Sequence, residues 1–152
     1  MTSQVATCQG ALFDYVAAKE PVLISACLLG IPCRWHGCRA KKCERLIKRL
    51  QKKYVLVPVC PEQLGGMPTP RTSEMLDGTG AEVLDGGLRL IAPETGEDVT
   101  LFHVNGAHYA LEIADIVGAK RAYMKGGSPS CDPDAVAGEV LKRGGVTAIR
   151  IP

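Results

Sequence analysis

The feature that most constrains the fold is the order strand, helix, strand near the start of the chain. Two apolar runs of strand length, residues 21–29 and 54–60, read PVLISACLL and YVLVPVC. Runs of this kind are typical of strands buried on both faces of a sheet. Between them, residues 39–53 place apolar side chains at helical spacing among basic ones. A helix that joins two strands in this order makes a right-handed parallel crossover, so the sequence predicts an α/β fold with a mainly parallel sheet.

The rest of the chain predicts more elements of the same kind. Gly and Pro are frequent between residues 61 and 100, and AEVLDGGLRLIAP at 81–93 predicts a hairpin excursion that turns at 85–87. Apolar positions then recur every three or four residues over 100–117, and Gly118 can end that helix. We expect a strand, a short helix and a last strand over residues 119–126, 132–143 and 146–152. Together these elements predict a small three-layer α/β domain.

No repeat, low-complexity segment or linker divides the 152 residues. We therefore expect one domain over residues 21–152, preceded by an N-terminal extension over residues 1–20. The first residues lack a basic flank and a sustained apolar run, and no stretch approaches the ~18 apolar residues of a membrane span. The seven cysteines are an odd number and cannot all pair internally. We expect a cytoplasmic protein with no membrane partner, whose thiols serve metals or catalysis.

Charge and aromatic content argue against a dedicated nucleic-acid binder. The chain has 18 Lys and Arg against 16 Asp and Glu, and only 5% aromatic residues. Nine basic residues and one acid lie between Arg34 and Lys53. Such a run is usually a solvated helix face, and the functional alternative is attraction of a phosphorylated ligand. Arg34 and Arg71 are the best candidates for phosphate contact, because Arg can bind phosphate through two parallel hydrogen bonds.

Three cysteines follow three different predicted strands. Cys27, Cys60 and Cys131 each lie at the carboxyl end of a strand or in the loop just after it. In a parallel sheet those ends share one edge, where ligands bind. Small or rigid neighbours surround each of them, which lets the backbone approach a bulky group closely. Spacing alone leaves open whether the three thiols hold zinc, hold an iron-sulfur group, or pack as small apolar side chains.

Several short motifs resemble one bacterial family in order and spacing. They are SACLLG, VCPEQLGG followed by PTPR, GEDVT and GGSPSC, and they extend from about residue 22 to residue 131. On these motifs the chain resembles the TudS-type thiouracil desulfidases. The resemblance implies a Rossmann-like fold and a 4Fe-4S cluster with three cysteine ligands, which would be Cys27, Cys60 and Cys131.

The resemblance also implies a reaction and the residues that perform it. A cluster held by three thiolates keeps one open iron, a Lewis acid suited to a soft thiocarbonyl sulfur. The substrate would be a thiolated nucleobase or nucleotide, converted to its oxo form and sulfide without net electron transfer. The carboxylate that activates water would be Glu62, and a serine of the SPSC motif would assist. We favour Ser128 over Ser130 for that role. Each of these three side chains could instead only cap a helix or turn.

Other chemistry-bearing residues carry weaker predictions. Cys33 and Cys38 with His36 could form a separate local metal site, although the paired spacing typical of zinc sites is absent. Cys43 lies on the apolar side of its predicted helix, where packing is the expected role. His103 and His108 fall in the long helix, where structural histidines are more common than catalytic ones. Cys8 precedes the matching motifs and is assigned no role.

Two other classes of function stay open. The chain could be a non-catalytic cluster, zinc or sulfur carrier, or an RNA-interacting module that uses its basic helix.

Family members continue after the third cysteine with a Gly-rich stretch containing Tyr-Asp-Gly and Phe-Ser-Gly, which this chain lacks. We expect the site to be more open, or to be closed by residues 1–20 or by a partner subunit in a homodimer. A tryptophan, Trp35, also stands where a tyrosine is more usual.

Overall fold

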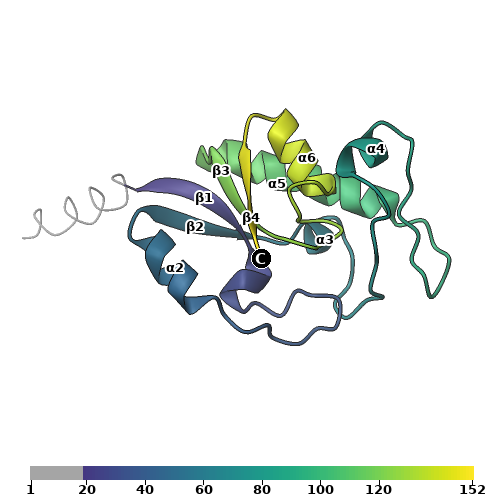
Figure 1. The fold of residues 1–152 in the computed structure, drawn as a ribbon, viewed down its shortest axis with the longest axis horizontal. Helices are drawn as coiled ribbons and strands as arrows, with labels where there is room; N and C mark the ends of the chain where they lie inside the picture. The colour runs from purple at the N-terminus through teal and green to yellow at the C-terminus, as the bar shows by residue number, and fades with distance from the viewer. Residues whose placement is uncertain (1–18) are drawn as a thin grey trace, which may run out of the picture.

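The computed structural model describes residues 19–152, and a four-stranded sheet lies at its centre (Figure 1). The strands are β1 (Glu20–Ser25), β2 (Tyr54–Val59), β3 (Arg121–Lys125) and β4 (Thr147–Ile151). They lie in the order β2-β1-β3-β4, and each neighbouring pair is parallel. The central strand β1 is therefore flanked on both sides, as its uninterrupted apolar run predicts.

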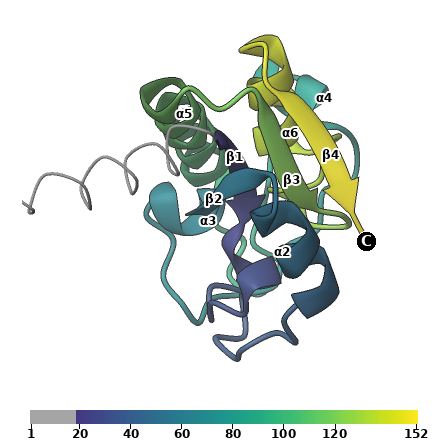
Figure 2. The ribbon, with the colours of Figure 1, turned by 90° about the vertical axis from the view of Figure 1, so that its left-hand side faces the viewer.

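Helices cover both faces of this sheet (Figure 2). Helix α2 (Glu44–Gln51) lies on one face, while α5 (Thr100–Val117) and α6 (Val136–Arg143) lie on the other. Alternate residues of β1 separate the two cores: Leu23 packs in the cluster of α5 and α6, and Ile24 packs with Leu50 of α2. The predicted three-layer α/β fold is confirmed. In residues 19–152, no helix combines the length and apolar character needed to cross a bilayer.

The predicted hairpin at 81–93 is wrong. Residues Gly80–Leu84 form the short helix α4 instead. Thr79 caps this helix: its hydroxyl accepts the backbone N–H of Glu82, and the Glu82 carboxylate accepts the backbone N–H of Thr79. This reciprocal capping satisfies two N–H groups that a turn would leave free, so it outweighs the Asp-Gly-Gly turn signal. Only an isolated antiparallel bridge between Ile91 and Asp98 remains in this region.

Several element boundaries also differ from the predictions. The first strand ends at Ser25, because Ala26–Leu29 turn into a short 3-10 helix, η1. The basic helix covers Glu44–Gln51 rather than 39–53, and the helix predicted from residue 132 begins at Val136. The division into an N-terminal extension and one domain stays a prediction, since residues 1–18 lie outside the described part.

A close contact between two backbones fixes the helix that follows β2. This helix, α3 (Pro61–Leu64), packs on α5 where Gly106 faces it. A β-carbon on Gly106 would lie 1.7 Å from the carbonyl oxygen of Pro61, and one on Gly65 would lie 1.9 Å from the carbonyl oxygen of Phe102. Neither position has room for a side chain. The pair of glycines therefore sets where α3, and with it Cys60 and Glu62, lies against the sheet.

The substitution Gly106→Ala tests this contact. Intrinsic helix propensity alone would stabilise α5 by about 1 kcal/mol. We expect the opposite sign, a loss of about 1–3 kcal/mol in the free energy of unfolding, because the new methyl group must displace the α3 backbone. Denaturant unfolding measures the change, with Asn105→Ala on the exposed side of α5 as the control. A Gly106→Ala protein as stable as the control would contradict the close packing.

Candidate active site

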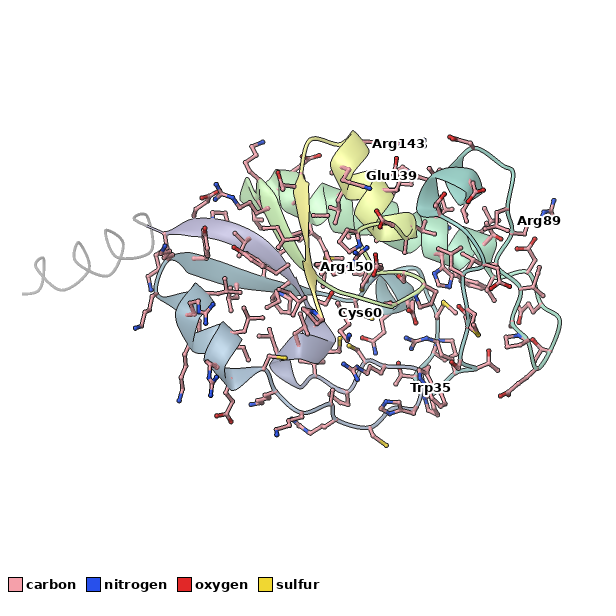
Figure 3. The ribbon with its side chains drawn as sticks, viewed as in Figure 1. Trp35, Cys60, Arg89, Glu139, Arg143 and Arg150 are labelled. Atoms are coloured by element: carbon pink, nitrogen blue, oxygen red, sulfur yellow. The ribbon has the colours of Figure 1, made fainter. Side chains whose placement is uncertain are left out.

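Three strand ends open into one cavity of about 260 Å³, slightly below the usual volume range of small-molecule sites. Cys27, Cys60 and Cys131 all line it, so the structure brings the three predicted cysteines together. They come from segments more than 30 residues apart and meet because β1, β2 and β3 run parallel. Figure 3 shows Cys60 near the middle of the molecule and Trp35 below it.

Local structure holds each of the three thiols in place. Cys27 belongs to η1, which Gly30 ends in the left-handed conformation at φ 79°. Cys60 is the N-cap of α3, and Pro61 follows it at the first helical position. Cys131 lies in the loop after β3, where its backbone N–H donates to the Ser128 hydroxyl at 3.1 Å. Each sulfur is therefore positioned by a turn that ends a strand.

A fourth cysteine, Cys33, also lines this cavity and is only 2% exposed. The Cys60 sulfur lies 3.7 Å from the Cys33 carbonyl oxygen. Within residues 19–152 no three His, Cys, Asp or Glu side chains form a group that could hold one ion, so the local alternative with Cys38 and His36 does not form, and Cys38 is exposed whereas Cys33 is buried. The left-handed turn at Gly30 returns the chain toward Cys27, and the Gly three residues after that cysteine was the signal that sequence reasoning missed.

The four thiols differ in how readily they ionise. A hydrogen bond from Cys33 lowers the pKa of Cys27 to about 6 against the opposing effect of burial, and Arg34 contributes in the same direction. Cys33 also lowers the pKa of Cys60. The pKa of Cys33 itself is raised by its hydrogen bonds to those two sulfurs. Burial raises the pKa of Cys131. The cavity thus favours ionisation of Cys27 and Cys60 over ionisation of Cys33 and Cys131.

The chemistry of this donor set suits an iron-sulfur cluster, because the cavity gathers thiols and no histidine of the described chain lines it. Soft thiolates without competing histidines suit iron-sulfur chemistry. A cationic metal group would also stabilise the Cys131 thiolate, which burial otherwise disfavours.

Glu62 lines the same cavity, and Arg71 fixes its orientation. The Arg71 Nε donates to Glu62 Oε2 at 2.6 Å, and Nη2 contacts the same oxygen. Its remaining N–H groups bind the carbonyl oxygens of Pro68 and Cys33 and the Thr69 hydroxyl. The structure therefore leaves no N–H of Arg71 for the phosphate contact that the sequence suggested. In the described chain, no donor contacts Glu62 Oε1, so that oxygen is available to water or substrate.

The two serines of the SPSC motif lie in different surroundings. Ser128 lines the cavity, and its oxygen accepts the backbone N–H groups of Ser130 and Cys131, so its own proton stays available to a ligand. Ser130 is fully buried and does not line the cavity. Of the two serines only Ser128 is placed to contact a ligand in the cavity, and its role in the reaction stays a prediction.

Positive charge at the cavity comes from two side chains, Arg34 and Lys125. Arg34 hydrogen-bonds Cys27, and both cations lower the pKa of that thiol. The other basic residues of the predicted helix, from Arg39 to Lys53, do not line the cavity. They are exposed on and around α2, as expected of a solvated face. Lys125 directly follows the last apolar residue of β3, and sequence reasoning did not single it out.

Sequence reasoning also missed a buried pair beside the thiols. Glu74 is a lining residue of the cavity, and its carboxylate Oε2 lies 2.5 Å from Nε2 of His103 on α5. Both side chains are almost completely buried, at 3% and 0% exposure. No local pattern links residues 29 positions apart, so only the fold reveals this pair.

Comparisons with known proteins indicate one family. The family model of 2-thiouracil desulfurase matches residues 22–150. The uncharacterised protein YbbK of Bacillus subtilis (strain 168) is 37% identical over 133 residues, covering 84% of this chain and 86% of its own. The solved structure of the 4Fe-4S-dependent thiouracil desulfidase TudS superposes with a TM-score of 0.74 at 28% identity. That match covers 87% of this chain and 91% of TudS.

The influence of Cys33 on its neighbours can be measured in metal-free protein. We expect the ultraviolet absorbance of thiolate to rise with a midpoint near pH 6 as Cys27 ionises. In Cys33→Ala this midpoint should move upward, because the thiolate loses its strongest hydrogen-bond donor. Cys43→Ala is the control, since Cys43 is half-buried and does not line the cavity. An unchanged midpoint in Cys33→Ala would contradict the contact.

Proposed function

This chain belongs to the 2-thiouracil desulfurase family, and we propose that it removes sulfur from a thiolated pyrimidine base or nucleotide. The observation that carries the proposal is the shared cavity: three motif cysteines from three strand ends line it beside the Glu62 carboxylate. A hydrolytic desulfuration needs both a soft binding site for sulfur and a base for water. Here the two lie side by side.

We propose Cys27, Cys60 and Cys131 as the ligands of a 4Fe-4S cluster. The dependence of TudS on such a cluster supports this, as does the thiolate character of Cys27 and Cys60. When bound, the cluster supplies a Lewis-acidic iron that binds the thiocarbonyl sulfur and makes the attached carbon more electrophilic. All six cysteines of the described chain are free thiols, in keeping with a reducing compartment such as the cytoplasm.

Glu62 is the proposed general base. Arg71 holds one carboxylate oxygen, and the other oxygen can take a proton from a water at the cavity wall. That water adds to the thiocarbonyl carbon, the carbon–sulfur bond breaks, and the electron pair leaves with sulfur. One water is consumed and one hydrogen sulfide is released for each oxo product. Because no electrons are gained or lost overall, the reaction needs no external oxidant or reductant.

Other lining residues suit a planar, polar substrate. The half-exposed ring of Trp35 offers a stacking surface, and base stacking on an aromatic ring contributes about 1–3 kcal/mol. The Ser128 hydroxyl can donate a hydrogen bond to a ring substituent or relay a proton. Arg34 is the remaining candidate for a substrate phosphate, since Arg71 is engaged within the protein. Closure of the cavity by residues 1–20 or by a partner subunit stays a prediction.

The substitution Glu62→Gln separates an enzyme from a non-catalytic cluster carrier. Gln keeps a hydrogen-bonding oxygen for Arg71 but cannot take the proton from water. We expect the rate of sulfide release from 2-thiouracil to fall about 10²–10⁴-fold. Iron and acid-labile sulfide, counted after anaerobic reconstitution, should match the wild type.

Glu94→Gln is the matched control, because Glu94 is exposed and does not line the cavity. It should release sulfide at the wild-type rate. If Glu62→Gln and Glu94→Gln turn over equally fast, Glu62 is not the base. If wild-type protein with a full cluster releases no sulfide from any thiolated pyrimidine, the carrier explanation holds instead.

A further inference from the structure

The Glu74–His103 pair is a buried hydrogen-bonded pair to which the reaction above gives no role. Glu74 belongs to the irregular segment before α4, and His103 lies in the first turns of α5. His103 and Gly106 are three residues apart, so they share one face of α5, the face that packs on α3. The pair is therefore attached to the same helix that positions Cys60 and Glu62.

The hydrogen bonds of this pair are incomplete on both sides. Glu74 Oε1 and His103 Nδ1 are buried and have no partner within the described chain. A neutral imidazole that donates from Nε2 leaves only a lone pair at Nδ1, which costs less than an unpaired N–H. This arrangement makes Glu74 the carboxylate partner, with Oε2 held by His103 and Oε1 unpaired.

An unpaired carboxylate oxygen inside a protein is costly, so it indicates a donor that the protein does not supply. Glu74 lines the cavity with the cysteines and with Ser128, so a ligand there can supply that donor. Oε1 is almost inaccessible to solvent in this structure, so a ligand must displace the side chains that cover it in order to donate an N–H or O–H group to it.

We propose that Glu74, oriented by His103, accepts the ring N–H next to the thiocarbonyl group and so selects thiolated rings that carry this N–H. The inference rests on the proposed function, since it assumes a thiolated pyrimidine in the cavity. In a free base both ring nitrogens carry hydrogen, whereas in a nucleotide the sugar occupies N1. The donor that both substrate forms share is N3–H. The preferred substrates are thus thiolated pyrimidines unsubstituted at N3.

Methylation of the ring nitrogens tests this assignment. We expect wild-type protein to desulfurate 2-thiouracil and 1-methyl-2-thiouracil with similar kcat/KM, and 3-methyl-2-thiouracil about 10–100-fold less efficiently. A hydrogen bond to a charged group accounts for a difference of this size. In Glu74→Gln, the amide can accept from His103 only by turning its NH₂ toward the ligand. The variant should therefore lose efficiency toward 2-thiouracil and no longer discriminate against the 3-methyl compound.

A binding measurement without turnover accompanies the kinetics. Uracil has the same N–H groups but no sulfur to lose, so calorimetry on anaerobic, cluster-loaded protein reports recognition alone. Uracil should bind wild type and the Glu94→Gln control equally, and should bind Glu74→Gln about 10–100-fold more weakly. Iron and sulfide content should not change in Glu74→Gln, since the residue is no cluster ligand.

The outcomes separate this inference from the proposed function. If thiouracil is desulfurated but Glu74→Gln keeps the wild-type preference against the 3-methyl compound, the role of Glu74 is refuted and the function stands. If no thiolated pyrimidine is desulfurated, the function fails, and the uracil comparison alone decides the role of Glu74. Equal uracil affinity in wild type and Glu74→Gln refutes it in either case.

Discussion

The convergence of cysteine thiols at the carboxyl edge of a parallel sheet is the constraint on which the site depends. Four cysteines line one cavity, and Cys33 lowers the pKa of both Cys27 and Cys60. Adjacent thiolates repel one another and are stabilised by cations, here by Arg34 and Lys125 in part. The fold thus lines the cavity with soft, electron-rich sulfur atoms, which suit a metal group as ligands.

Two carboxylates belong to residues that line the cavity, and in the described chain both are hydrogen-bonded through one oxygen only. Glu62 is held through Oε2 by Arg71, and Glu74 is held through Oε2 by His103. In each case the second oxygen makes no hydrogen bond within the described chain. A hydrogen bond to one oxygen holds the orientation of the carboxylate, and the other oxygen can accept a proton or a hydrogen bond from water or a ligand. Glu62 is partly exposed and suits a water, whereas Glu74 is nearly sealed and suits a ligand N–H.

Much of this architecture could be predicted from the sequence, because apolar strands and an amphipathic helix are local patterns. The predicted parallel sheet was enough to place Cys27, Cys60 and Cys131 at one edge. The hairpin was mispredicted because a capping pair, Thr79 and Glu82, competed with a turn signal that looks stronger in the sequence. The Glu74–His103 pair could not be predicted, since its members meet only through tertiary packing. The hydrogen bonds that occupy every N–H group of Arg71 could not be predicted for the same reason.

The central claim is that three cysteines hold a cluster whose remaining iron is free for sulfur. Mössbauer spectra of anaerobically reconstituted wild-type protein, before and after addition of 2-thiouracil, test it most directly. The account predicts a 4Fe-4S cluster with one iron distinct from the other three, and a change confined to that iron when the thiolated base is added. Four equivalent thiolate-bound irons, with Cys33 as the fourth ligand, would contradict it. So would protein that assembles no cluster at all.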